Sequence, residues 1–206
     1  PMPVPLDHMA VAAFGGRLFV IGGYSADFIP RAEVWIYRPQ SGWTAGAPLP
    51  SARGAAWAVE HQGKIYLFGG ISPSGFVTRT TFIYDPVENE WSSGADMPTA
   101  REHLNAVSAG SFIYVIGGRA GQSTRANERY DPVANQWSSM APMPTARSAM
   151  VAAHLDGIIY AAGGEVPMLF AVNEAYNIAG NSWSTVTPMA IGGFAMGATV
   201  GYNYIR

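Results

Sequence analysis

Three arginines recur at one position of this sequence, and a cluster of guanidinium groups could bind an anion. Arg53, Arg101 and Arg147 each stand three residues after the last proline of a short turn. A guanidinium group can hold a carboxylate through two parallel hydrogen bonds, which a lysine cannot reproduce. Alternatively, each arginine bonds to carbonyl groups of its own loop, and the recurrence favours this interpretation because specific sites usually break a repeat's symmetry. The first and fifth units have Leu6 and Gly193 at this position, so the arginines would line only one side of the ring.

Polar residues that do not recur form a second group of candidates. Arg119 and Glu165 each directly follow a glycine pair, whereas Tyr24 and Ile71 follow the other two pairs in the first two units. Loops that vary on a repetitive scaffold tend to carry its function. We therefore expect Arg119, Glu165 and Tyr24 to be ligand contacts, with solvated loop charges as the alternative for the two ionic residues.

A third type of chemistry, proton transfer, needs a histidine or a carboxylate at the same site. His8 and His103 share a position in the first and third units, and Glu102 precedes His103. The spacing of these histidines lacks the pattern of a metal site, and structural roles are favoured for both. The sequence therefore predicts no metal site and no cofactor, and His103 remains a candidate for ligand binding.

Composition excludes several classes of function. The chain has no cysteine, which removes thiolate catalysis, disulfides and thiolate metal sites. A net charge of −2 predicts no nucleic-acid partner, and no apolar run is long enough to span a membrane. We find no nucleophile elbow, dinucleotide-binding glycine motif, phosphate loop or zinc-protease motif. These observations leave the cellular compartment open.

An internal repeat must position all of these candidates. Four glycine pairs are spaced by 46 to 48 residues, and each is followed by a tyrosine and then a tryptophan. The pairs are Gly22-Gly23, Gly69-Gly70, Gly117-Gly118 and Gly163-Gly164. A period of this length predicts a stacked or radial repeat architecture.

Each unit has the pattern of four short antiparallel strands and no helical periodicity. Two-residue connections that suit tight hairpins join the first two strands: Gly15-Gly16, Gln62-Gly63, Gly110-Ser111 and Asp156-Gly157. One column of the first strand is mostly alanine, as an innermost strand of a β-propeller requires: Val11, Ala58, Ala106, Ala152 and Ala198. We therefore predict an all-β propeller of four-stranded antiparallel blades, with the variable loops gathered at one end.

The repeated residues resemble those of kelch repeats. The glycine pair, the spaced tyrosine and tryptophan, Tyr-Asp-Pro at 84–86 and 130–132, and Met-Pro-Thr-Ala-Arg at 97–101 and 143–147 carry the resemblance. It covers the whole chain and implies a scaffold that hosts many activities. The copper site of galactose oxidase, a kelch relative, depends on a Tyr-Cys crosslink, and the absence of cysteine argues against such a site here.

The chain divides into repeat units 1–47, 48–95, 96–141 and 142–187, with part of a fifth unit at 188–206. We treat residues 1–206 as a single propeller domain. Kelch propellers usually close with six or seven blades, so the resemblance implies that this chain covers only part of a larger ring.

Two functions from different classes fit the sequence. The resemblance implies a non-enzymatic recognition module that binds a protein or peptide partner through the loops of one propeller face. Phe28, Phe76 and Phe170 lie in those loops and either form a contact patch or tuck beneath them. The alternative is an enzyme similar to bacterial sialic acid mutarotases, in which the recurring arginines hold an acidic sugar while Glu102, His103 or Glu165 moves protons. The lack of a catalytic motif favours the first.

Overall fold

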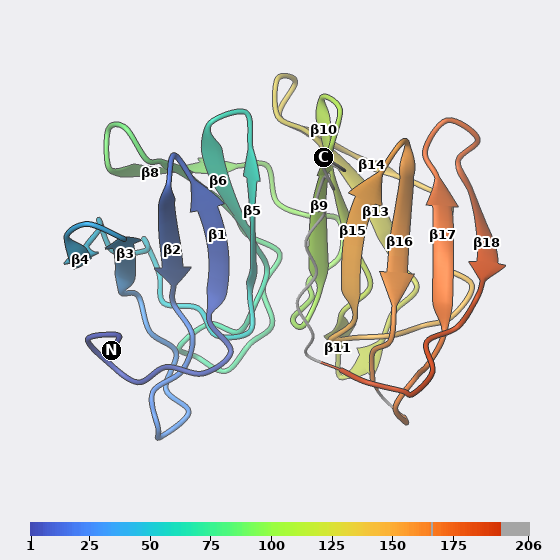
Figure 1. The fold of residues 1–206 in the computed structure, drawn as a ribbon, viewed down its shortest axis with the longest axis horizontal. Coiled ribbons are helices and arrows are strands. Elements are labelled where there is room, and N and C mark those ends of the chain that lie inside the picture. The colour runs from blue at the N-terminus through green and yellow to red at the C-terminus, as the bar shows by residue number, and fades with distance from the viewer. Residues whose placement is uncertain (166, 195–206) are drawn as a thin grey trace, which may run out of the picture.

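The computed structural model describes residues 1–165 and 167–194, which fold into four sheets of four antiparallel strands (Figure 1). No described segment is helical, so the all-β prediction is confirmed. Blade 1 contains β1 (Ala10–Phe14), β2 (Arg17–Ile21), β3 (Val34–Arg38) and β4 (Gly42–Ala45); blade 2 contains β5 (Trp57–His61), β6 (Lys64–Phe68), β7 (Thr81–Asp85) and β8 (Glu90–Gly94). Blade 3 contains β9 (Asn105–Ala109), β10 (Phe112–Ile116), β13 (Asn127–Asp131) and β14 (Gln136–Ser139); blade 4 contains β15 (Val151–Leu155), β16 (Ile158–Ala162), β17 (Asn173–Asn177) and β18 (Ser182–Val186). A small ribbon, β11 (Arg119–Ala120) with β12 (Gln122–Ser123), follows β10.

The inner hairpins of all four blades turn over the predicted residue pairs. Their registers bring Phe14 opposite Arg17 in blade 1 and Leu155 opposite Ile158 in blade 4. Gln62 and Gly63 have φ values of 50° and 85°, as a type I′ turn requires. At Gly110-Ser111 only the glycine has positive φ, the type II′ pattern.

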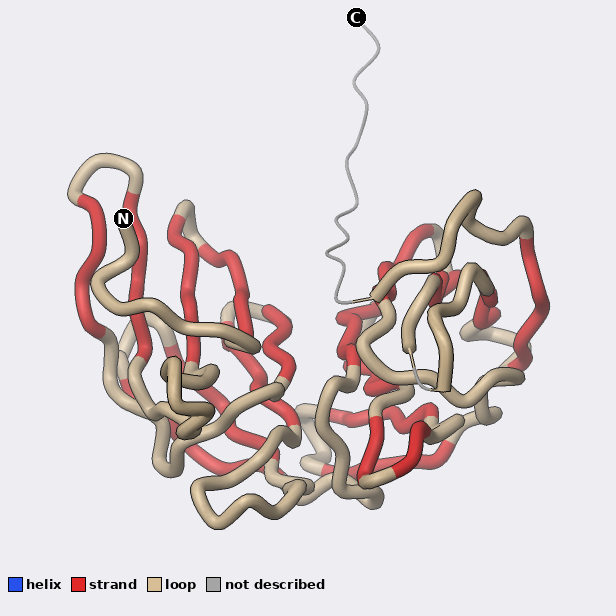
Figure 2. Tube along the Cα trace, turned by 90° about the horizontal axis from the view of Figure 1, so that it is seen from below, coloured by secondary structure: helices blue, strands red, loops and turns tan. Residues whose placement is uncertain are grey.

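The blades are arranged radially, because the first strand of each blade lies beside the first strand of the next. Strand β1 contacts β5, β5 contacts β9, and β9 contacts β15. Figure 2 shows the four blades side by side along an open arc. Ala58 and Ala106 of the predicted small column are buried where these strands approach, whereas Val11 of the first blade is exposed and Ala198 lies outside the described residues.

A repeated clamp joins each blade to the one before it. In blade 3, Trp137 Nε1 donates to the carbonyl of Ala95 (2.8 Å), and the Ala95 amide donates to Asn135 Oδ1 (2.6 Å). Tyr130 Oη donates to the same Asn135 oxygen (2.6 Å). Blades 2 and 4 repeat these contacts on Ala47 and Ala141. In blades 2 to 4 the spaced tyrosine and tryptophan are thus inter-blade connectors, with the tyrosine ring buried and the tryptophan ring packed against the core.

The glycine pairs are required by close backbone approach between units. Gly69 has φ 63°, and a Cβ there would lie 2.2 Å from the carbonyl oxygen of Arg101. Its neighbour Gly70 donates its amide to that same oxygen (2.9 Å). Because the next unit's turn is bonded to the glycine pair, the variable loops that follow the pairs emerge together at the lower end in Figure 1.

Candidate functional site

The structure places two of the three recurring arginines inside their blades. Arg101 and Arg147 have no exposed surface, and their guanidinium groups pair with Glu128 (2.5 Å) and Glu174 (2.6 Å). Each also donates to the carbonyl of the first glycine of its blade's pair, at 2.8 Å and 2.7 Å. Their charges are compensated within the blade, and their guanidinium groups lie away from the loop surface. The bonds to the glycine carbonyls agree with the second interpretation of these positions, in which each arginine bonds to carbonyl groups of its own repeat unit.

Arg53 differs because none of the described carboxylates forms an ion pair with it. It is 4% exposed and donates to Ser51 Oγ and the Ala52 carbonyl, both at 2.8 Å, and to Thr80 Oγ1 at 3.2 Å. Its guanidinium carbon lies 5.1 Å from the centre of the Phe82 ring. Phe82 occupies in β7 the place that glutamates hold in β13 and β17, so a cation–π contact replaces an ion pair. Burial lowers the pKa of Arg53.

The two non-recurring ionic candidates meet in one network. Arg119 Nη1 donates to Glu165 Oε1 at 2.9 Å, and Arg119 Nε donates to Glu102 Oε1 at 2.5 Å. The backbones of Glu102 and Arg119 also exchange two hydrogen bonds of 2.9 Å, which fixes the two side chains side by side. The Arg119 side chain is one-quarter exposed, and its guanidinium group already holds two carboxylates. Sequence reasoning selected Arg119 and Glu165 separately and missed their contact, which depends on how neighbouring blades meet.

His103 lies beside this network and faces His8. Its Nδ1 contacts Glu102 Oε2, and the two histidine rings meet edge to face with centroids 5.1 Å apart. Burial, with smaller contributions from the charges of Arg119 and His8, lowers the pKa of His103 to about 4. The ring is therefore neutral at pH 7, and we assign its proton to Nδ1 because that atom faces a carboxylate. Nε2 is left as a hydrogen-bond acceptor.

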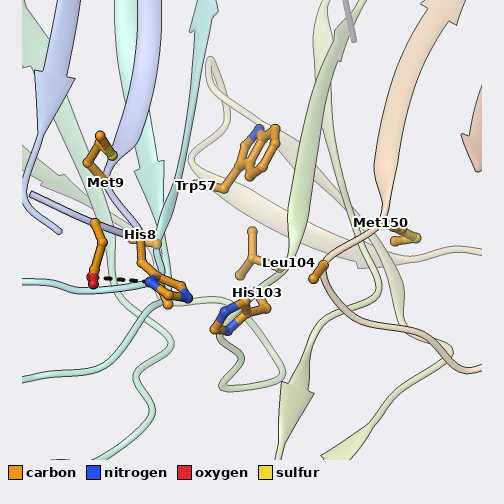
Figure 3. A pocket seen from close by; sticks show the side chains of 10 residues that line it. His8, Met9, Trp57, His103, Leu104 and Met150 are labelled. Atoms are coloured by element: carbon orange, nitrogen blue, oxygen red, sulfur yellow. Dashed lines mark hydrogen bonds and ion pairs between the residues drawn. The ribbon is translucent and has the colours of Figure 1, made fainter. Parts of the chain in front are cut away.

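Beside the two histidines the surface is hollowed, because blade 2 places two small residues there. Ala55 and Ala56 stand in the columns that hold His8 and Met9 in blade 1. A cavity of about 360 Å³ results. It is lined by Asp7, His8, Met9, Ala55, Ala56, Trp57, His103, Leu104, Ala149 and Met150 (Figure 3). The small residue of blade 2 in both columns, next to larger residues in blades 1 and 3, was the sequence signal that could have located it.

A second hollow, of about 370 Å³, shares His8 and His103 with the first. One wall is a succession of rings: Phe28 with Tyr24 (6.1 Å between centroids), and Tyr24 with His8 (5.8 Å). The other wall is the loop that begins at Ile71 and includes Pro73 and Gly75. Tyr24, a predicted site residue, is itself 8% exposed and packs over Gly54, where a Cβ would collide with its ring.

The loop-end aromatics separate into two kinds. Phe28 and Phe76 are 69% and 74% exposed, and Phe170 is half-buried.

Among the residues that the structure describes, no group of three histidines or carboxylates is arranged to hold a metal ion. The site is therefore a hollow with apolar walls, edged by two histidines, by carboxylates and by an arginine that two carboxylates share.

Four-stranded blades around a common centre, with variable loops and hollows at one end, define a β-propeller. The family model described as the KLHDC2/KLHL20/DRC7 Kelch-repeats domain matches residues 1–164, and the Kelch motif matches residues 146–190. The chain belongs to the kelch-repeat family of β-propellers. Kelch propellers serve in general as protein-interaction modules, which bounds the function without naming a partner.

Individual relatives cover only segments of the chain. Beta-scruin of Limulus polyphemus is 40% identical over 81 residues, 36% of this chain and 9% of that protein. Kelch-like protein 35 of Mus musculus is 33% identical over 87 residues, 42% of this chain and 14% of that protein. The solved structure of YjhT superposes with a TM-score of 0.82 at 18% identity, covering 94% of this chain and 74% of that one. The chain thus spans a small fraction of the length of beta-scruin and of Kelch-like protein 35.

Proposed function

We propose that this chain is a recognition module that binds a protein or peptide partner at its loop end. The observation that carries the proposal is the pair of hollows that meet at His8 and His103, flanked by the exposed rings of Phe28 and Phe76. Exposed aromatic side chains beside a concave surface are typical of interaction sites. The kelch family membership agrees with it.

Substitution of both exposed phenylalanines tests the proposal. We expect Phe28→Ser with Phe76→Ser to lose partners that the wild-type chain captures from a lysate of the source cells. The matched control is Val87→Ser with Val133→Ser, because these valines are 76% and 89% exposed in turns between the third and fourth strands of blades 2 and 3. Equal capture by both double variants, measured by quantitative mass spectrometry, would contradict a loop-end interface.

A sugar-converting enzyme that handles an acidic sugar, similar to sialic acid mutarotases, is the second candidate. The observation in its favour is the Glu102–His103 contact beside a cavity, since His103 Nε2 could accept a proton there. Against it, Arg101 and Arg147 are buried and paired, so they offer no guanidinium to a sugar carboxylate. The test of this function is the rate of exchange between the anomers of N-acetylneuraminate, followed by NMR. If the protein does not accelerate this exchange, the sugar-converting function is ruled out.

We also propose that the four blades form part of a larger ring. Leu18 of blade 1 is 36% exposed, whereas Ile65, Ile113 and Ile159 in the same column are fully buried. At the other end of the arc, Tyr160 is 38% exposed, whereas its counterpart in blade 3 is 1% exposed. The variant Leu18→Ser tests this proposal, because further blades would cover Leu18 in the full gene product. We then expect the variant to lose more unfolding free energy in the full gene product than in this chain. An equal, small loss in both would refute the larger ring.

A further inference from the structure

We propose that the first hollow, the one lined by Asp7, receives an apolar side chain of a partner peptide, and that a lysine or arginine of the same peptide binds the Asp7 carboxylate at the rim. The proposal rests on the proposed recognition function and specifies its partner chemistry. Figure 3 shows the side chains of His8, Trp57, His103 and Leu104 around the space that this apolar group would fill.

The walls of the hollow suit an apolar group. Its volume of about 360 Å³ lies at the lower end of the range of roughly 300–1,000 Å³ for ligand pockets. Met9, Leu104 and Met150 contribute flexible apolar side chains, and methionine adapts readily to the shape of a ligand. Because these walls present few polar groups, a buried polar side chain of a partner would lose hydrogen bonds to water without replacement.

The charges around the hollow favour a cation over an anion. Neither hollow is lined by a lysine or an arginine. Arg119, the cation of the adjoining network, is shared between Glu102 and Glu165. Asp7 adds a carboxylate that lines the first hollow and is about half exposed, with His8 Nδ1 at 3.1 Å. Glu102 and Glu165 therefore share one guanidinium group, while Asp7 lines a hollow to which no lysine or arginine contributes.

The aromatic wall extends the site for a cationic partner. The backbones of Asp7 and Tyr24 exchange hydrogen bonds of 3.1 Å and 2.8 Å, so the exposed carboxylate stands beside the chain of rings that leads outward to Phe28. A lysine or arginine held by Asp7 would lie close to these rings, and cations are attracted to ring faces. An anionic side chain at the same place would meet like charge.

Three synthetic peptides on one glycine-serine frame test this chemistry by isothermal titration calorimetry. Their central residues are lysine-leucine-lysine, glutamate-leucine-glutamate and lysine-serine-lysine. We expect the first to bind about threefold to tenfold more tightly than the second, which corresponds to one or two rim charge pairs, and we expect the preference to shrink in high salt. The serine peptide should bind at least about fivefold more weakly than the leucine peptide, because it forfeits burial of an apolar side chain.

Two protein variants locate the effect. Asp7→Asn should remove most of the preference for lysine over glutamate, whereas Asp27→Asn, an equal charge change at an exposed position of the same loop end, should leave it intact. Equal or tighter binding of the glutamate peptide, an unaltered affinity for the serine peptide, or no binding of any peptide would each overturn the proposal. The recognition function itself would stand or fall separately, on capture by the Phe28 and Phe76 variants.

Discussion

His8 and His103 belong to different blades, yet their rings meet edge to face at the centre of the loop end, 5.1 Å between centroids. Both residues have positive φ, at 45° and 48°, and so do Ala55 and Ala149 in the same column. Hydrogen bonds run along this column from the Ala55 amide to the His8 carbonyl (3.0 Å) and from the His103 amide to the Ala55 carbonyl (3.1 Å). The main chain thus forms a bonded arc that carries the two rings toward one another.

The neutral state of His103 should appear in the pH dependence of stability. Its pKa is lowered to about 4 in the folded chain, while the unfolded chain takes up a proton near pH 6.5. Between these values the unfolded state binds more protons, so the free energy of unfolding falls as the pH is lowered through this window. In His103→Gln we expect a shallower fall from pH 6.5 to 4, measured by urea unfolding. Identical slopes in the two proteins would show that the histidine is not held neutral.

Glu128 should matter far more than an exposed ion-pairing residue. Glu128→Ala leaves the Arg101 guanidinium buried without a counter-charge, which we expect to cost about 3–5 kcal/mol of unfolding free energy. Lys64→Ala breaks a surface pair with Asp85 and should cost less than about 1 kcal/mol. Chemical denaturation of both variants measures the difference. Similar costs would mean that water reaches Arg101 and solvates its charge.

Arg53 should respond to a glutamate placed where blades 3 and 4 have one. Phe82→Glu and Phe82→Gln lose the same apolar ring, but only the glutamate can pair with Arg53. We therefore expect the glutamate variant to be more stable than the glutamine variant by about 1–3 kcal/mol. The difference should vanish or reverse in the Arg53→Met background. A difference that is insensitive to Arg53 would exclude the ion pair.

The blade clamp at Asn135 can be separated into its backbone and hydrogen-bonding parts. Asn135 has φ 52° and accepts hydrogen bonds from Tyr130 and from the Ala95 amide. Asn135→Gly removes the hydrogen bonds but tolerates the positive φ, and it should cost about 1–3 kcal/mol. Asn135→Ala should cost roughly 1 kcal/mol more, because alanine is strained there. Thermal unfolding of both variants measures these values, and a neutral glycine variant would show that the clamp contributes nothing.

Much of the fold could be predicted because its signals are local. Glycines with positive φ, the turn residues and the tyrosine–tryptophan spacing each constrain a few neighbouring residues, and their recurrence gave the blades and their hairpins. The small inner column likewise pointed to radial packing. The expected inner strand that includes Ala198 lies outside the described residues.

The candidate site was less accessible to sequence reasoning, as three residues show. Arg101 and Arg147 were selected for their charge, but their environment depends on Glu128 and Glu174, which lie on the third strands of the same blades. His103 was selected, but its facing partner His8 was left aside because the two lie in different repeat units. Which residues meet at the centre is set by the angle and spacing between blades, and no local pattern encodes these.

The amino-acid order by itself determined the repeat, the strand count of a blade, the hairpin turns and the end at which the variable loops gather, because each follows from short-range backbone geometry or from periodicity. Only the tertiary structure decided that two recurring arginines are buried ion-pair partners, that Arg119 joins Glu102 to Glu165, and that small residues of blade 2 open a hollow beside two histidines. Charge compensation and cavity shape are properties of side chains brought together from different units, so they exist only once the blades are packed.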